Sequence, residues 1–358
     1  MKVCVIELNK FHTEIFPIYE NFLPIIFPNR HLKIHYFVVP QKYEELKNIY
    51  GGNFHKVYQP AVYNVCSKTG IRKYYFKYRV SRIVREHQPD LIILNSIAPK
   101  RIWYAFDSIS DKLKFGIVHG FDELSPQDRE NTFYFVLGEN VFQKYSGQNI
   151  HAYLLPFFPQ FTFKQEKQPK HKEFVIAIQG NIDFRRRDYP LLVNIAKELK
   201  ARCINGIKFN IVGGMRHRDA RTLRNMVSES GVQSYFLFHK SLNDEQFYRE
   251  IIESHFLMPL LGETQKRYLS NDTISSTLSH SGSYNKPMIL SYNNANLWQM
   301  NDQIALIYGE KQDLIDIMMH LPDKHNYSHL CKSLNSWKEQ RIEENRRHLQ
   351  SVFKNLLD

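Results

Sequence analysis

Features that define several protein classes are scarce in this sequence. Its 358 residues include four cysteines, which are scattered without a CxxC pair or the spacing of metal ligands. This pattern argues against a disulfide framework or a zinc site, so we expect free thiols in a reducing compartment. No apolar run is long enough to cross a membrane, because residues 16–27 are interrupted by Glu20, Asn21 and two prolines. The first residues, MKVCVIELNK, are expected to form a strand rather than a signal peptide, since charge interrupts them early.

Acidic residues are fewer than basic ones: 36 Asp and Glu stand against 48 Lys and Arg, a formal charge of +12. This excess favours polyanionic partners, which include nucleotides, nucleic acids and anionic membrane surfaces. The sequence has no zinc site, RNP motif or glycine-hairpin clamp, so we expect no nucleic-acid partner. Internal repeats and low-complexity tracts are also missing. A hydrophobic content of 43 %, with 25 Phe and 21 Tyr, predicts a sizeable core and excludes a disordered chain.

Apolar runs of strand length alternate with helical patterns along the whole chain, which predicts parallel sheets covered by helices. The predicted strands are 3–7, 32–39, 55–58, 91–94, 115–118, 133–137, 150–155, 173–178, 207–212, 235–239, 256–260, 288–291 and 303–308. The predicted helices are 41–49, 70–87, 100–109, 141–145, 190–202, 217–229, 244–253, 273–283, 311–320 and 334–357. The chain is long enough for two cores. We therefore expect an α/β protein with two Rossmann-like, doubly wound domains facing a cleft.

The alternation breaks between Pro156 and Lys172, where three prolines and a charged tail follow neither period. This break divides the chain into an N-terminal domain (1–158), a linker (159–172) and a C-terminal domain (173–333). The remaining residues, 334–358, are expected to form a helix that packs back toward the N-terminal domain.

The stretch Glu173–Pro190, EFVIAIQGNIDFRRRDYP, is a buried strand that ends in a loop with Gly180 and three arginines, followed by a helix. A turn of this kind lets backbone N–H groups approach an anion, and the helix dipole favours its charge. Guanidinium forks suit phosphate oxygens. We expect Arg187 to be the main phosphate ligand, Arg185 its helper, and Arg186 to point to solvent. The alternative is a solvated basic turn.

The second half resembles the donor-binding domain of GT-B glycosyltransferases, and family 4 in particular. The matching pieces occur in the family's order, and Asn285 stands where the family usually has glycine. They are Gly180 with Arg185–Arg187, Gly213-Gly214, Asp244-Glu245, the strand end at Pro259, and Asn285-Lys286-Pro287. Family 4 members usually carry two glutamates in the segment before the last proline; here those positions hold Asp272 and His280. The glycine-rich loop that follows the family's first strand is replaced here by residues 7–12.

The resemblance implies a donor site that holds a nucleotide-diphosphate sugar without metal or cofactor; an Asp-x-Asp metal motif is missing from the sequence. The donor and phosphate ligands expected on these motifs are Gly180, Arg185, Arg187, Gly214, Asp272, Ser275, Ser276 and His280. Ser275 and Ser276 begin a helix, so their alternative role is ordinary capping. His280 would contact ribose or base, or else be packed in the core. The polar loop with Glu263, Lys266 and Arg267 would close over the donor or simply be solvated.

Candidate catalytic residues lie in the first half. His119 ends a strand, where ligands gather in open α/β sheets, and the resemblance implies that it orients the donor sugar or the acceptor hydroxyl. A core histidine bonded to a backbone carbonyl is the alternative. Asp122 and Glu123 are candidates for the acceptor base if the enzyme inverts configuration. His12 is a further, weaker candidate.

The predicted helix 70–87 interleaves Lys and Arg with tyrosines, which suits either an anionic membrane surface or an ordinary solvated face. The function that we expect is transfer of a sugar to a glycan or lipid-linked acceptor in surface polysaccharide or lipopolysaccharide synthesis. The enzyme would be cytoplasmic, or peripheral on the inner face of the membrane. The alternatives are a GT-B nucleotide-sugar epimerase or phosphorylase, and a non-catalytic binding protein on the same scaffold.

Overall fold

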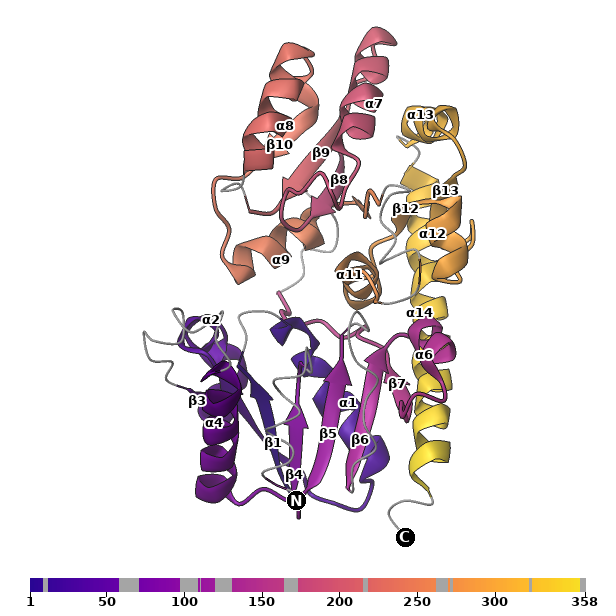
Figure 1. The fold of residues 1–358 in the computed structure, drawn as a ribbon. Helices are drawn as coiled ribbons and strands as arrows, with labels where there is room; N and C mark the ends of the chain where they lie inside the picture. The colour runs from indigo at the N-terminus through magenta and orange to yellow at the C-terminus, as the bar shows by residue number, and fades with distance from the viewer. Residues whose placement is uncertain are drawn as a thin grey trace. The chain divides into compact units, whose positions relative to one another are not determined.

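The computed structural model describes residues 1–8, 12–57, 71–96, 109, 111–119, 131–163, 173–214, 218–261, 270, 273–321 and 324–354. The chain divides into two compact units (Figure 1). Unit 1 comprises Met1–Pro156 together with Glu343–Asp358, and unit 2 comprises Phe157–Ile342.

Unit 1 contains a seven-stranded parallel sheet with the order β3-β2-β1-β4-β5-β6-β7. Its strands are β1 (Lys2–Glu7), β2 (Lys33–Val38), β3 (Phe54–Lys56), β4 (Leu91–Leu94), β5 (Leu113–Val118), β6 (Thr132–Leu137) and β7 (Ala152–Leu154). Its described helices are α1 (Phe16–Ile26), α2 (Pro40–Tyr50), α4 (Ile71–His87) and α6 (Glu139–Tyr145), with short 3₁₀ turns at Thr13–Ile15 and Gly51–Asn53. The strand order reverses between β1 and β4, and in such sheets ligands bind at the carboxyl ends of the strands beside that point.

Unit 2 repeats this plan with six parallel strands in the order β10-β9-β8-β11-β12-β13. Its strands are β8 (Phe174–Gln179), β9 (Ile207–Val212), β10 (Phe236–Phe238), β11 (Phe256–Leu257), β12 (Met288–Ser291) and β13 (Ala305–Tyr308). Its described helices are α7 (Tyr189–Ala201), α8 (Arg218–Glu229), α9 (Asp244–Glu253), α11 (Ser276–Tyr284), α12 (Tyr292–Leu297) and α13 (Lys311–His320), and a 3₁₀ turn covers Gln233–Tyr235. Here the order reverses between β8 and β11. The predicted α/β class with two doubly wound, Rossmann-like domains is confirmed.

The last helix, α14 (Lys324–Phe353), contributes residues to both units. It begins ten residues before the predicted helix 334–357. In unit 1, the ring of Phe353 lies 5.9, 5.5 and 5.7 Å from the rings of Phe115, Phe133 and Phe135. The side chain of Asn345 donates to the carbonyl of Tyr153 at 2.8 Å. The C-terminal part of α14 therefore belongs to the core of unit 1.

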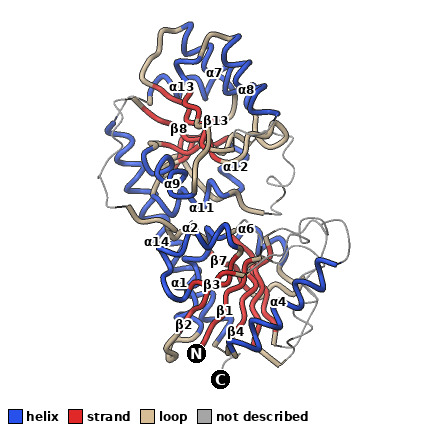
Figure 2. Tube along the Cα trace, turned by 90° about the vertical axis from the view of Figure 1, so that its left-hand side faces the viewer, coloured by secondary structure: helices blue, strands red, loops and turns tan. Residues whose placement is uncertain are grey.

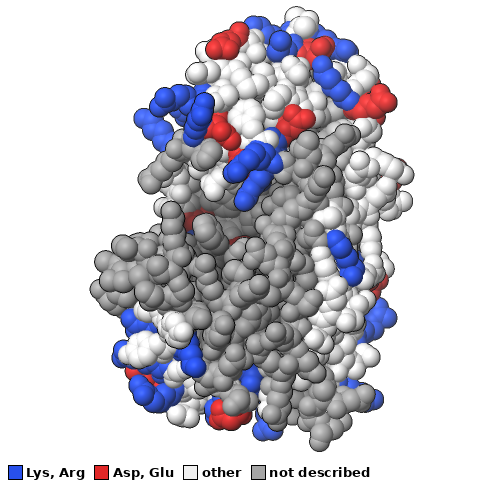
Figure 3. All heavy atoms as spheres, in the orientation of Figure 1, with Lys and Arg blue, Asp and Glu red and all other residues white. Residues whose placement is uncertain are grey.

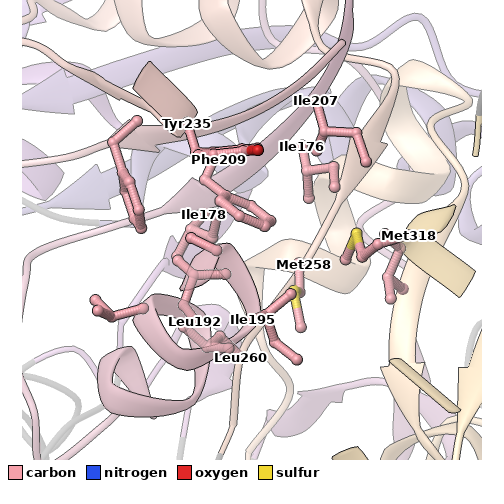
Figure 4. Packing of buried hydrophobic residues seen from close by; sticks show 14 of the residues in the cluster. Ile176, Ile178, Leu192, Ile195, Ile207, Phe209, Tyr235, Met258, Leu260 and Met318 are labelled. Atoms are coloured by element: carbon pink, nitrogen blue, oxygen red, sulfur yellow. The ribbon is translucent and has the colours of Figure 1, made fainter. Parts of the chain in front are cut away.

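The core of unit 2 follows from the alternation of side chains along its strands. Phe174, Ile176 and Ile178 of β8 point to one face and pack with residues of α7, α8 and α13, including Leu192 and Met318 (Figure 4). Gln179 belongs to the opposite face, because successive strand residues alternate. There it meets α11, which carries two of the predicted donor ligands. Both faces of the sheet are covered, which accounts for the continuously apolar strand sequences.

In unit 1, α1 and α4 lie on opposite sides of the sheet (Figure 2). The α4 side carries three histidines, one each from β2, β3 and the end of α4. Nδ1 of His35 lies 2.9 Å from Nε2 of His55, and the ring of His87 lies 5.1 Å from that of His55. Burial, followed by the charges of His55, Lys2 and Lys33, lowers the pKa of His35 to about 4. Burial also lowers the pKa values of His55 and His87.

Because the pKa values of these three histidines are lowered in the folded chain, we expect unit 1 to lose stability in mild acid. The unfolded chain takes up protons near the ordinary histidine pKa, about 6.5, whereas the folded chain resists them. These histidines therefore cost no stability above about pH 6.5, and their cost grows as the pH drops toward 4. Urea unfolding at a series of pH values should show a shallower acid slope in His35→Phe than in wild type. The exposed His31→Asn provides the control, and equal slopes in all three proteins would contradict the prediction.

Candidate functional site

The loop after β8 is shaped by three glycines. Gly180 adopts a φ of +96°, a conformation that side chains rarely tolerate. Gly213, at the end of the neighbouring β9, lies so close that a Cβ atom there would be 1.9 Å from the carbonyl oxygen of Gly180. A Cβ atom on Gly214 would lie 2.6 Å from Oδ1 of Asn181. The glycines thus let two strand ends meet at the carboxyl edge of the sheet, where α/β proteins bind ligands.

Arg187 lies directly over this turn. Its Nη2 atom would be 3.0 Å from a Cβ atom on Gly180, and its side chain is partly buried. Asp188 begins α7 by accepting a hydrogen bond from the backbone N–H of Leu191 at 3.0 Å. A guanidinium group is therefore held beside an exposed backbone turn and just before a helix, an arrangement that suits a phosphate group.

The other two arginines of the loop are directed toward Asp183. Arg185 donates to both carboxylate oxygens of Asp183, from Nε at 3.0 Å and from Nη2 at 2.9 Å. This hydrogen bond from Arg185 lowers the pKa of Asp183 to about 2. Arg186 lies 3.7 Å from the same carboxylate, and its side chain is 55 % exposed. Of the three arginines, Arg187 is the one placed against the glycine turn.

The first turn of α11 adjoins the end of β8. Ser275 caps the helix by accepting a hydrogen bond from the N–H of Thr277 at 3.2 Å. The hydroxyl of Ser276 accepts from Nε2 of Gln179 at 3.0 Å. An N-terminus of a nine-residue helix thus lies beside the end of β8, and the positive end of its dipole favours an anion. The adjoining candidate Asp272 lies outside the described residues.

His280, one turn further along α11, is packed among aromatic rings. It is 5 % exposed, and its Nδ1 atom lies 2.9 Å from Oε1 of Gln179. The rings of Phe247, Tyr248 and Tyr284 surround it at 5.8, 5.3 and 6.3 Å. Gln179 therefore joins two of the predicted donor ligands, Ser276 and His280, to the end of β8.

A second polar cluster lies at the carboxyl ends of β1 and β4 in unit 1, the point where the strand order reverses. Glu7, Asn95 and Ser96 are all buried. Oε2 of Glu7 accepts hydrogen bonds from Nδ2 of Asn95, at 2.8 Å, and from the hydroxyl of Ser96. The hydroxyl of Tyr19 donates to Oδ1 of Asn95. These contacts tie the ends of two neighbouring strands together.

The same cluster holds the two predicted histidines. Nδ2 of Asn95 donates to the backbone carbonyl of His12 at 2.8 Å, and the backbone carbonyl of Asn95 lies 2.8 Å from Nε2 of His119. A carbonyl can only accept, so Nε2 of His119 carries the proton. The two imidazole rings stack with centroids 4.0 Å apart and 30° between their planes. His12 has the left-handed φ of 69°, which costs energy at a residue other than glycine.

Glu14 gives the histidine pair a negative neighbour. Its Oε1 atom lies 3.5 Å from Nδ1 of His12. Burial raises the pKa of Glu14, but the hydrogen bond from His12 and the charges of His12 and His119 outweigh burial and bring it to about 2. An ionised carboxylate beside His12 favours a proton on Nδ1 and leaves Nε2 as the basic atom of a neutral ring.

Sequence reasoning singled out His12 and His119 but missed four residues around them: Glu7, Glu14, Asn95 and Ser96. A usable signal was present, because Asn95-Ser96 directly follows the fully apolar strand LIIL. Polar residues that end a buried strand are the ones that reach the binding edge of the sheet. Asp122 and Glu123, as well as the loop with Glu263, Lys266 and Arg267, lie outside the described residues.

The described part of the chain bears on metal binding and on membrane insertion. Within that part of the chain, no group of three or more His, Cys, Asp or Glu side chains is arranged to hold a metal ion. None of the described helices combines the length and apolar character needed to cross a bilayer.

Comparison with known proteins gives similarity in structure only. No protein-family model matches the sequence, and no curated protein matches it. A glycosyltransferase from Rickettsia africae superposes with a TM-score of 0.64 at 10 % identity, over 100 % of this chain and 98 % of the other. The apo form of the lipopolysaccharide outer core galactosyltransferase WaaB gives 0.58 at 13 % identity, over 98 % and 99 %.

A third similar structure is a putative UDP-N-acetylglucosamine 2-epimerase from Listeria monocytogenes, with a TM-score of 0.56 at 10 % identity over 96 % of this chain and 94 % of that one. Identities this low establish the fold rather than the activity. The chain thus shares the two-domain α/β fold, known as GT-B, of glycosyltransferases and of at least one epimerase-like protein.

Proposed function

We propose that this protein is a glycosyltransferase that moves a sugar from a nucleotide-diphosphate donor to a glycan or lipid-linked acceptor. The observation that carries the proposal is the position of Arg187 over the Gly180 turn, at the carboxyl end of β8. A nucleotide diphosphate needs cationic and N–H donors at such a point, and its charge rises when the sugar leaves. The similarity in fold to glycosyltransferases supports this choice.

The donor would be held entirely by residues of unit 2. Arg187 and the first turn of α11 neutralise the diphosphate without requiring a metal ion. Ser275, Ser276 and Gly214 are assigned to the same diphosphate, and Arg185 would join them on leaving Asp183. His280 is assigned to the ribose or base of the donor, and Asp272 to the transferred sugar.

The acceptor side is assigned to unit 1. His119, whose Nε2 atom donates to the carbonyl of Asn95, is assigned to orient the donor sugar or the acceptor hydroxyl. His12, whose ring stacks on that of His119, is a further candidate for the acceptor base, as are Asp122 and Glu123. We place the reaction in the cytoplasm, in the synthesis of a surface polysaccharide such as lipopolysaccharide.

The test combines binding with product analysis. Nucleoside diphosphates of uracil, guanine and thymine should be screened by thermal shift, since a bound ligand raises the melting temperature by mass action. The matching sugar donor should then yield a glycosylated acceptor detectable by mass spectrometry. In His119→Asn, nucleotide binding should persist while transfer falls by about 100-fold. If none of these nucleotides binds, the proposal fails and a non-catalytic binding protein is favoured.

The epimerase is the second candidate, because the Listeria protein shares the fold over nearly the whole chain. An epimerase or a phosphorylase would change the free donor without any glycan acceptor. Incubating the donor alone, or with inorganic phosphate, therefore separates the candidates. Epimerised or phosphorolysed donor in the absence of acceptor would replace the transferase assignment.

A further inference from the structure

Helix α4 presents two tyrosines to solvent. Tyr74 and Tyr78 are 65 % and 55 % exposed, and they lie four residues apart, so they are neighbours on one side of the helix. Its opposite side, which includes Phe76, Val80 and Ile83, is buried against the rest of unit 1. In the described part of the chain, the other exposed large hydrophobic side chains are Ile49, at 41 %, and Tyr292, at 60 %.

The same helix is strongly basic. Residues 71–87 contain six Lys or Arg and a single acidic residue, Glu86. Glu86 accepts a hydrogen bond from Nε of Arg82 at 2.6 Å, so its charge is already matched. Lys77, Arg82 and Arg85 are exposed together with the tyrosines. Lys and Arg side chains gather at the lower left of Figure 3, where Figure 1 places α4.

Arg79 links the aromatic and basic residues of this surface. Its Cζ atom lies 5.2 Å from the ring centroid of Tyr75 and 5.8 Å from that of Tyr78, and its Nε donates to the hydroxyl of Tyr75 at 3.0 Å. Such contacts restrain the rings and keep a positive charge beside them. Rings with one apolar and one polar end, flanked by long basic side chains, are the groups that settle at the boundary between lipid tails and headgroups.

We propose that this face, defined by Tyr74, Lys77, Tyr78, Arg82 and Arg85, docks α4 flat on an anionic lipid surface. The helix cannot insert further, because its other side belongs to the core of unit 1. Two tyrosines alone give weak apolar anchoring, so most of the attraction must come from the basic residues, each of which contributes modestly near an anionic surface. Binding should therefore be reversible and sensitive to salt. This inference does not depend on the identity of the donor.

Flotation with lipid vesicles tests the docking surface. We expect the full chain to float with phosphatidylcholine vesicles that contain phosphatidylglycerol, to remain below with phosphatidylcholine alone, and to be released by high salt. The double variant Lys77→Glu/Arg85→Glu should weaken binding by about tenfold or more, since each reversal replaces attraction with repulsion. Tyr74→Ser/Tyr78→Ser should weaken it by a smaller factor at the same net charge.

The matched control is Lys197→Glu/Arg221→Glu, which makes the same change of charge at exposed positions of α7 and α8 in unit 2. It should float like wild type. Equal losses in both charge variants would overturn the proposal, because binding would then follow net charge alone. Failure of the wild type to bind anionic vesicles would overturn the proposal too. Tighter binding of the full chain to RNA than to anionic vesicles would also overturn it. Nucleoside diphosphate binding, measured on the same variants, should be unchanged, so this test is separate from that of the proposed function.

Discussion

Replacing Arg187 with methionine is expected to lower the affinity for the donor's nucleoside diphosphate by about 100-fold. A hydrogen bond to a charged group contributes roughly 1.5–3 kcal/mol, and each 1.4 kcal/mol is a tenfold change in affinity. Methionine keeps the length and apolar body of the side chain but removes its charge and its donors. Isothermal titration calorimetry on the variant and the wild type measures the difference directly.

Two further variants separate phosphate binding from a structural role of Arg187. Arg187→Lys keeps the charge but loses the planar fork, so its affinity should fall between those of wild type and Arg187→Met. Arg186→Met removes an exposed arginine of the same loop and should bind like wild type. Wild-type affinity in Arg187→Met, or an equal loss in Arg186→Met, would contradict the phosphate assignment.

Gly213→Ala is expected to have the largest effect on stability. The added Cβ atom would lie 1.9 Å from the carbonyl oxygen of Gly180, and the contact is with backbone rather than with a flexible side chain. β8 and β9 would have to separate at their ends, which breaks the close pairing of Gly180 N–H with the carbonyl of Val212 at 2.8 Å. Overpacking that moves backbone costs about 3 kcal/mol or more.

Urea unfolding followed by circular dichroism measures this cost. Gly52→Ala is the matched control, because a Cβ atom there meets nothing within 4 Å and the residue has no positive φ. The control should unfold at the wild-type urea concentration, whereas Gly213→Ala should unfold earlier and bind nucleotide more weakly. If Gly213→Ala unfolded like the control, the close approach of the two strand ends would be disproved.

The sequence predicted most strands and helices because the sheets are parallel and covered on both faces. A strand such as LIIL in β4 is then apolar at every position and stands out from its polar surroundings. The residue that ends α11 could also be predicted from the sequence. Asn285 stands where the family that the second half resembles usually has glycine. Its φ of 52° is a left-handed conformation that asparagine tolerates.

Elements that depend on tertiary contacts were missed or misplaced. Helix α12, with the sequence YNNANL, is rich in asparagine, a poor helix former, and is stabilised by the Ser291 cap and by burial of Asn294 and Ala295. The helix predicted from residue 273 begins at Ser276, because several residues before it could act as caps and Ser275 is the one that does. Local propensity could not choose among them.

The candidate site could also be predicted only in part from the sequence. Single polar residues at strand ends, such as His119, could be picked out along the chain. The cluster around Asn95 could not, because its partners Glu7, His12 and His119 are distant in sequence and are joined only by the order of the strands. In unit 2, the sequence already favoured Arg187 over Arg185, but it did not show that Arg185 donates to the carboxylate of Asp183.

The position of α14 affects how the chain folds during its synthesis. Asn345 and Phe353 complete the core of unit 1, yet Asn345 lies 192 residues after its partner Tyr153. In a growing chain, Phe115, Phe133 and Phe135 therefore lack the covering ring of Phe353 until the whole of unit 2 has been synthesised. Contacts of such long sequence separation form slowly, and exposed apolar surface favours aggregation in the meantime. The core of the first unit thus closes only after the second unit has been made, and we expect a chaperone to protect it until then.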